Sequence, residues 1–123
     1  MKTAVIIKGN PEFVNNNPQA GKFYDGLRTF LESLDYSVTF DPGLPHTKPV
    51  DADLWISHSW GSSRLPFAPK GTKTIALGTK GGINHPRDRA LEPSQMPDEF
   101  HYILTAEMKD TIKEYLNLPY NRS

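Results

Sequence analysis

Residues Asp51–Leu65 read DADLWISHSWGSSRL, a short apolar run that leads directly into a histidine, a serine, a tryptophan and a glycine. The run Ala52–Ser57 is rich in β-forming residues and too short for a typical helix, so it predicts a buried strand that ends at a turn. Residues 3–7 (TAVII), 36–40 (YSVTF) and 73–77 (KTIAL) have the same character. Each of these runs stops near glycine or proline, so we expect four short strands.

Two further segments show helical spacing. The first has an apolar face that follows the strand at 3–7, and the second lies near the C-terminus, where Thr105 is a suitable N-cap and Pro119 marks the end. Apolar strands that alternate with helices predict a parallel sheet covered on both faces, and we therefore expect an α/β fold, a three-layer α/β/α sandwich with a short, mostly parallel sheet. The residues of the two apolar faces are Phe23, Leu27, Phe30, Leu31 and Leu34, and Met108, Ile112, Tyr115 and Leu116.

The connections between the later strands contain no helical pattern. Residues 41–51 (DPGLPHTKPVD) are rich in proline and predict an extended crossover, and residues 81–99 predict irregular surface chain with one helical turn at most. An extended crossover covers a sheet less well than a helix. We therefore expect an exposed apolar strip near Val50, Leu54 and Trp55, which would serve as a homodimer surface.

Composition narrows the classes of function. The 14 Lys and Arg balance the 14 Asp and Glu, which argues against a nucleic-acid partner or an anionic membrane surface. No apolar run reaches the roughly 18 residues of a membrane span, and we expect a cytoplasmic protein with one domain over residues 1–123. The absence of cysteine excludes disulfides and thiolate ligands, and the histidines lack metal-ligand spacing, so we expect neither a metal nor a cofactor.

The turn after the third predicted strand has the spacing of a catalytic motif. Residues Ser57-His58-Ser59-Trp60-Gly61 give S-x-S-x-G, with serine at the first position of the G-x-S-x-G nucleophile elbow. The stretch ADLWISHSWGSSRL resembles the strand and elbow of the α/β-hydrolase family, closest to its small serine hydrolases without a lid. PDEFHYILTAEMKDTIKEYLNL resembles the end of that family, where a catalytic histidine precedes the last helix. TAVIIKGNPEFVNNN resembles its first strand and oxyanion loop.

This resemblance implies a minimal hydrolase-like fold and assigns roles to individual residues. Ser59 matches the nucleophile and His101 the general base, because a serine hydroxyl needs a base within hydrogen-bond reach to attack a carbonyl. The backbone N–H groups of Trp60 and Asn10 match the oxyanion donors. The chain would then hydrolyse a small ester, thioester or amide through an acyl-enzyme.

The acid of the triad is the departure from the family. Gly81 and Gly82 stand where the family carries its carboxylate, and Asp88 follows in the same segment. We expect Asp88 to be the acid, with Asp98 and Glu92 as weaker candidates. Without a carboxylate the histidine loses the group that fixes its tautomer, a loss of about 10⁴ in turnover in the well-studied triad.

Two other functions stay open on the sequence. One is a catalytically impaired binding or regulatory protein on a hydrolase-like scaffold, because the first glycine of the elbow and the expected acid are both missing. The other is a small flavodoxin-like domain that binds a nucleotide phosphate through the LGTKGG loop, although this loop matches neither G-x-G-x-x-G nor the Walker pattern.

Overall fold

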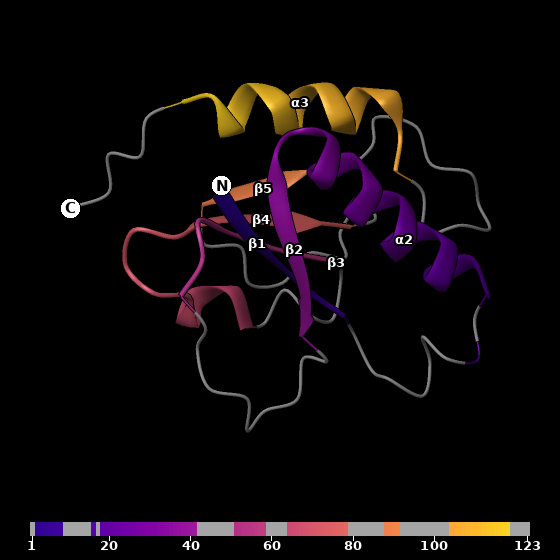
Figure 1. Cartoon of the computed structure of the whole chain (residues 1–123), viewed down its shortest axis with the longest axis horizontal. Helices are drawn as coiled ribbons and strands as arrows, with labels where there is room; N and C mark the ends of the chain where they lie inside the picture. Colours follow the sequence, from indigo (N-terminus) through magenta and orange to yellow (C-terminus); the bar gives the residue numbers. More distant parts are fainter. Residues whose placement is uncertain are drawn as a thin grey trace.

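The computed structural model describes residues 2–8, 16, 18–41, 51–58, 64–78, 88–91 and 104–118. Within these residues the chain forms five strands and two long helices, together with one 3₁₀ turn at residues 64–67 (Figure 1). The elements in chain order are β1 (Lys2–Ile7), α2 (Pro18–Ser33), β2 (Tyr36–Asp41), β3 (Leu54–His58), β4 (Lys73–Leu77), β5 (Arg89–Leu91) and α3 (Ala106–Leu116).

The five strands form one parallel sheet with the order β2-β1-β3-β4-β5. The parallel sheet and the α/β class that the sequence predicts are thus confirmed, as are the four strands first recognised by their apolar runs. The edge strand β5 was not predicted, because the sequence indicated irregular chain there. With three residues, only one of them buried, β5 is too short to show a periodicity.

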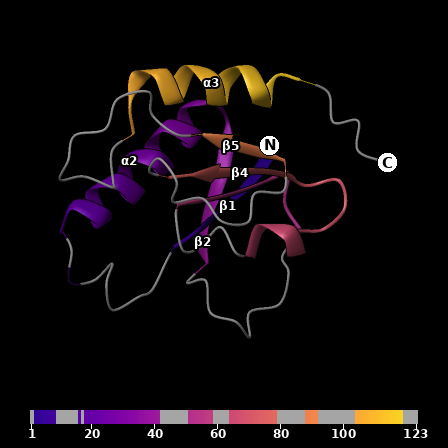
Figure 2. The ribbon, with the colours of Figure 1, turned by 180° about the vertical axis from the view of Figure 1, so that it is seen from behind.

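Both long helices pack on the same face of the sheet. Figures 1 and 2 show α2 and α3 side by side on that face. Their buried side chains, among them Leu27 and Ile112, form one cluster with Ile6 and Ile56 of the central strands. The Thr105 side chain accepts a hydrogen bond from the Met108 N–H at 3.1 Å, which confirms Thr105 as the N-cap of α3.

The opposite face of the sheet carries a smaller apolar cluster. Leu65 and Ala68, in and just after the 3₁₀ turn, pack there against Val5, Ile7 and Trp55. In the described part of the chain this turn covers the face that a third layer of helices would cover, and Figure 2 shows it across the sheet from α3. The three-layer arrangement therefore stays a prediction.

The exposed strip that we expected near the third strand is wrong for two of its three residues. Leu54 and Trp55 are 0% and 1% exposed, because Leu54 faces the helices and Trp55 lies under the 3₁₀ turn. Val50 lies outside the described residues, and so does the extended crossover at 42–50. Leu54 and Trp55 thus contribute no apolar surface to a homodimer.

Two matching Asp–Thr contacts fix the register at the amino ends of the strands. Asp53, just before β3, accepts a hydrogen bond through Oδ2 from the Thr3 N–H at 2.8 Å, and Asp88, just before β5, accepts one from the Thr74 N–H at 3.1 Å. In return, the N–H of each aspartate donates to the hydroxyl of its threonine, at 3.3 and 3.1 Å. A slip of one residue would break both bonds of a pair, so each contact specifies the alignment of its strands.

Candidate functional site at the carboxyl edge of the sheet

The strand order reverses direction between β1 and β3. From β1 the chain steps outward to β2 on one side, and β3, β4 and β5 follow on the other side. In open parallel α/β sheets, ligands bind beyond the carboxyl ends of the strands at such a switch point, because the connections on its two sides leave toward opposite faces. The carboxyl ends of β1 and β3, at Ile7 and His58, therefore form the framework of the candidate site.

A buried hydroxyl ties these two strand ends together. Ser57 is fully buried, and its Oγ donates a hydrogen bond to the Ile7 carbonyl oxygen at 3.0 Å. Ile7 and Ser57 are also partners in the register of β1 and β3. Ser57 holds the first position of the S-x-S-x-G motif, where the elbow pattern has glycine. Here its hydroxyl fixes the end of the strand that precedes the predicted turn.

His58, next along the chain, is a packing residue. Its side chain is 3% exposed and lies edge to face against Phe23 of α2, with ring centroids 5.2 Å apart and an interplanar angle of 66°. Phe23 in turn contacts the ring of Tyr24 in a T-shaped arrangement. The imidazole therefore anchors the end of β3 to the first helix.

A buried ion pair crosses the opposite face at the same edge. Arg64 Nη1 lies 2.9 Å from Asp41 Oδ1, and the two side chains are only 11% and 6% exposed. Asp41 ends β2, whereas Arg64 begins the 3₁₀ turn that follows β3, so the pair spans the end of β1 between them. The Arg64 guanidinium also lies 5.9 Å from the centre of the Trp55 ring. Arg64 thereby holds the 3₁₀ turn, which follows the predicted elbow, against the sheet.

The side chain of Lys8 places a positive charge beside β1 on the helix-covered face. Its ammonium lies 4.3 Å from the centre of the Phe40 ring and 5.9 Å from that of Tyr24, within the range of cation–π attraction. Its backbone N–H donates to the Asp41 carbonyl oxygen at 2.9 Å, which continues the pairing of β1 with β2. Lys8, the last described residue before the predicted oxyanion segment, thus contacts both β2 and α2.

The residues predicted to perform the chemistry continue directly from this framework. Ser59 and Trp60 follow His58, and Asn10 follows Lys8 by two positions, so both predicted segments start from neighbouring strand ends. Ser59, Trp60, Asn10 and His101 themselves lie outside the described residues. Their roles as nucleophile, oxyanion donors and base stay predictions.

Asp88 occupies a different part of the sheet. It pairs with Thr74, which is level with Trp55, four residues before Ser59. At about 3.3 Å per residue this places Asp88 about 13 Å back along the strands, toward the amino edge. Its Oδ2 atom accepts hydrogen bonds from the N–H and the hydroxyl of Thr74, at 3.1 and 3.2 Å. These bonds give Asp88 a structural role, and its assignment as the triad acid stays a prediction because His101 lies outside the described residues.

Sequence reasoning missed the Asp41–Arg64 pair. The two residues are 23 positions apart, in segments that the sequence describes as a strand end and a turn, and nothing in either segment indicates its partner. Among the described residues there is no group of three or more histidine, aspartate or glutamate side chains that could hold a metal ion. In the same part of the chain, neither helix is long and apolar enough to cross a membrane.

Comparisons with family models, with curated proteins and with solved structures returned no match for this chain.

Proposed function

We propose that the chain is a small serine hydrolase that cleaves an ester, thioester or amide through an acyl-enzyme on Ser59. The observation that carries the proposal is the strand order, because it brings the carboxyl ends of β1 and β3 together at a switch point. The predicted nucleophile segment continues from one of these ends and the predicted oxyanion segment from the other. Under this proposal the finer fold is a minimal three-layer α/β-hydrolase sandwich.

The proposed reaction has two steps. His101 takes the proton of the Ser59 hydroxyl as its oxygen attacks the carbonyl carbon of the substrate, and the N–H groups of Trp60 and Asn10 donate to the resulting oxyanion. The leaving group departs with the proton from His101. Water then attacks the acyl carbon while His101 takes its proton, and His101 returns this proton to the Ser59 oxygen as the acid is released.

The hydrogen bonds between Asp88 and Thr74 affect the rate of hydrolysis that we expect, because they engage the carboxylate that was predicted to be the acid. A serine and a histidine without a carboxylate form a dyad, and the histidine then lacks a partner that orients it and stabilises its charged form. We therefore propose a slow hydrolase with Ser59 and His101 as its catalytic residues. Glu92 and Asp98, both outside the described residues, remain the alternatives for the acid.

A fluorophosphonate probe tests the proposal. Labelling is expected at Ser59, with loss in Ser59→Ala and a strong reduction in His101→Gln, because the probe reacts with an activated hydroxyl. Ser37→Ala is the matched control, since Ser37 is an exposed serine in β2 that takes no part in the proposed site. Labelling that survives in Ser59→Ala, or that is absent from the wild-type protein at high probe concentration, would refute the proposal.

A second candidate function is favoured by the same strand order. The order 2-1-3-4-5 is also that of flavodoxin-like domains, which bind a phosphate-bearing cofactor at the switch point between the first and third strands. A protein of this kind would bind a nucleotide or flavin nucleotide without acylation. Saturable binding of such a ligand, together with no labelling at Ser59, would favour this function, or that of an impaired hydrolase-like binding protein, over catalysis.

A further inference from the structure

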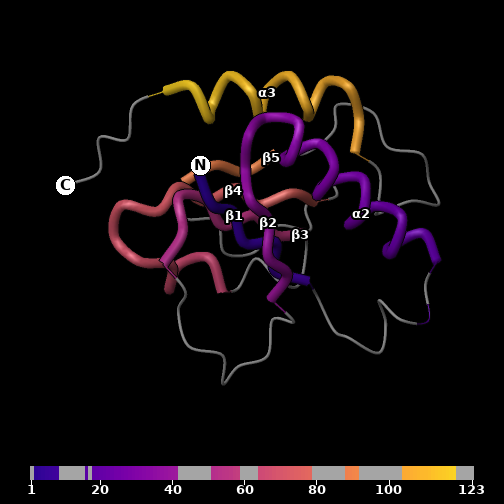
Figure 3. Tube along the Cα trace, in the orientation of Figure 1, coloured from indigo at the N-terminus to yellow at the C-terminus, as the bar shows by residue number. Residues whose placement is uncertain are grey.

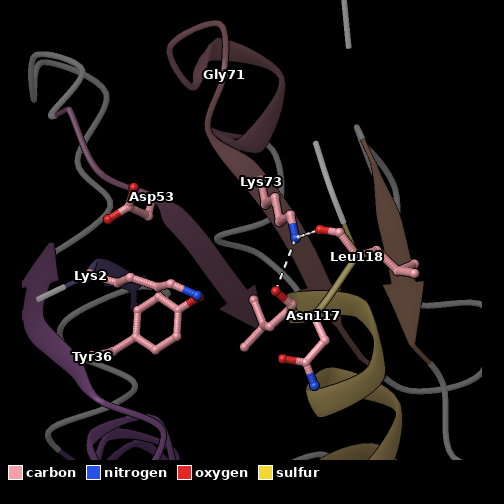
Figure 4. Close-up of a pocket in the computed structure, with 8 residues that line it drawn as sticks. Lys2, Tyr36, Asp53, Gly71, Lys73, Asn117 and Leu118 are labelled. Carbon is pink, nitrogen blue, oxygen red and sulfur yellow. Dashed lines mark hydrogen bonds between the residues drawn. The ribbon is translucent and has the colours of Figure 1, made fainter. Parts of the chain in front are cut away.

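The amino edge of the sheet, at the other end of β3, contains a pocket of about 510 Å³. This volume lies in the range of small-molecule sites, about 300–1,000 Å³. Figure 4 shows its lining groups, which come from the first residues of β1, β2 and β4, from the residue before β3 and from the end of α3. They are Lys2, Tyr36, Asp53, Gly71, Lys73, Leu116, Asn117 and Leu118.

The fold creates this pocket because α3 runs back across the sheet and ends above the amino ends of the strands, a course that Figure 3 traces. Lys73 lies beneath that end. Its ammonium donates to the carbonyl oxygens of Tyr115 and Leu116, at 3.1 and 3.2 Å, and also to that of Leu118. The three donors of one ammonium are thus all engaged with the C-terminal carbonyls of the helix. Lys73 therefore serves as a helix cap and offers no donor to a ligand.

Two opposite charges in the pocket remain available to a ligand. Lys2 projects from β1, with its ammonium 5.8 Å from the centre of the Tyr36 ring, and Asp53 lies on the neighbouring chain just before β3. The Asp53 carboxylate uses Oδ2 to accept its bonds from Thr3. Among the described residues no ion pair joins Lys2 to Asp53. The pocket thus holds a cation and an anion that do not neutralise one another directly.

Tyr36 and Lys73 line the pocket together with these two charges. Tyr36 is 6% exposed, and its pKa is raised above 10.0, first by burial and second by the negative charge of Asp53. On the other side, the pKa of Lys73 is lowered by burial and by the positive charge of Lys2. Both shifts have burial as their first cause, and the charges of Asp53 and Lys2 add to them in the same direction.

We propose that this pocket binds a free α-amino acid with an apolar side chain, whose carboxylate pairs with Lys2 and whose ammonium pairs with Asp53. Leu116 and Leu118 supply apolar surface for the side chain, and Leu118 is 58% exposed, as expected for a wall that a ligand would cover. A smaller pocket of about 150 Å³ shares Lys2, Tyr36, Leu116 and Asn117, and it extends the space toward Leu34.

A ligand of a single charge fits this pocket less well. Lys73 and the carbonyl end of α3 compensate one another. An anion alone would therefore meet the Asp53 carboxylate, and a cation alone would meet the ammonium of Lys2. A zwitterion places each of its charges against the opposite charge of the protein, and a charge-assisted hydrogen bond is worth more than a neutral one.

The test compares three probes whose side chains are the same. L-leucine carries both charges, N-acetyl-L-leucine has lost the positive charge, and L-leucinamide has lost the negative one. Titration followed by amide chemical shifts should show saturable binding of L-leucine below about 10 mM, with the shifts centred on Asp53, Lys73 and Asn117. Each derivative should bind at least about tenfold more weakly.

Protein variants complete the test. Lys2→Gln and Asp53→Asn should each weaken L-leucine binding by about tenfold or more. Asp88→Asn is the matched control for Asp53→Asn, because Asp88 makes the same contacts with a threonine outside the pocket, and exposed Lys22 on α2 supplies Lys22→Gln as the control for Lys2→Gln. Both controls should bind L-leucine within about twofold of the wild-type protein.

The proposal is overturned by any of three results: no saturation with L-leucine, equal binding of either derivative, or equal loss of binding in a variant and its control. If Asp53→Asn does not fold, Lys2→Gln and the two derivatives still decide the outcome. None of these measurements depends on Ser59.

Discussion

The contribution of the buried Asp41–Arg64 ion pair to the free energy of unfolding can be tested quantitatively. Its atoms lie 2.9 Å apart and its side chains are almost completely covered, so removal of one partner leaves the other charge with little access to water. Such stranding costs about 3–5 kcal/mol in buried pairs. Because Arg64 retains 11% exposure, we take the lower limit and expect Asp41→Ala and Arg64→Ala each to lower the free energy of unfolding by about 3 kcal/mol.

The double variant removes both charges together. Its free energy of unfolding should therefore fall by less than the sum of the decreases in the two single variants. If it loses about 3.5 kcal/mol, the coupling energy of the pair is about 2.5 kcal/mol, within the range found for residues in direct contact. Urea unfolding of the four proteins, monitored by circular dichroism, measures these quantities with the slope of the transition as a check on two-state behaviour.

The chain also offers a matched control. Arg28 and Glu32 form an ion pair one turn apart on α2 at 3.6 Å, with side chains 50% and 49% exposed. The corresponding single and double alanine variants of Arg28 and Glu32 should give a coupling energy of at most about 0.5 kcal/mol, because water screens an exposed pair and ordering two long side chains costs entropy. Equal couplings for the two pairs would refute the argument that burial sets the strength of the pair between Asp41 and Arg64.

Three further predictions concern the amino edge. Lys73→Met should lower the free energy of unfolding by about 1 kcal/mol or more, because the C-terminal end of α3 loses its ammonium cap. Amide hydrogen exchange in the last turn of α3 should become faster. Unchanged exchange in that turn would contradict the capping role of Lys73. The pKa of Tyr36 is raised in the folded protein, so above pH 10.0 the unfolded chain loses this proton first and the free energy of unfolding should fall as the pH rises toward the folded pKa. Tyr36→Phe should make that fall shallower. An alkaline unfolding profile that is the same in Tyr36→Phe would count against this prediction. Asp35 has a φ of 69° at the end of α2, so Asp35→Gly should raise the free energy of unfolding by about 1 kcal/mol in urea, and a loss of stability would show that its side chain outweighs the strain.

The sequence was sufficient to predict those elements whose stability depends on one continuous buried face. The strand at 73–77 was predicted at its observed bounds, and α3 was predicted with its N-cap, because apolar spacing and a capping threonine act within a few residues of one another. β1, β2 and β3 were each located to within two residues at either end.

The features that the sequence did not reveal depend on pairing across the fold. β5 exists because β4 offers it a paired edge and because Asp88 binds Thr74, and neither cause is visible in three residues. The same holds for the Asp41–Arg64 pair, whose members meet only once β1 lies between them. For the candidate catalytic residues, the chain order predicted the edge of the sheet from which Ser59 and Asn10 continue. It did not predict that Asp88 would be level with the amino half of β3.

The two ends of β3 have different physical tasks, and this difference bears on where an acid for His101 is to be sought. An aspartate that precedes a strand can complete the hydrogen bonding of the sheet. Its carboxylate accepts a hydrogen bond from a backbone N–H of the neighbouring strand, as those of Asp53 and Asp88 both do. A residue that follows a parallel strand lies instead at the carboxyl edge of the sheet, where Ser57 and Arg64 fix the framework. If His101 lies beside Ser59 as proposed, we expect its carboxylate to come from chain that follows the carboxyl end of a strand. Substitution of Glu92, which directly follows β5, is the informative experiment: loss of Ser59 labelling in Glu92→Gln with retention in Asp88→Asn would support this argument, and the reverse result would refute it.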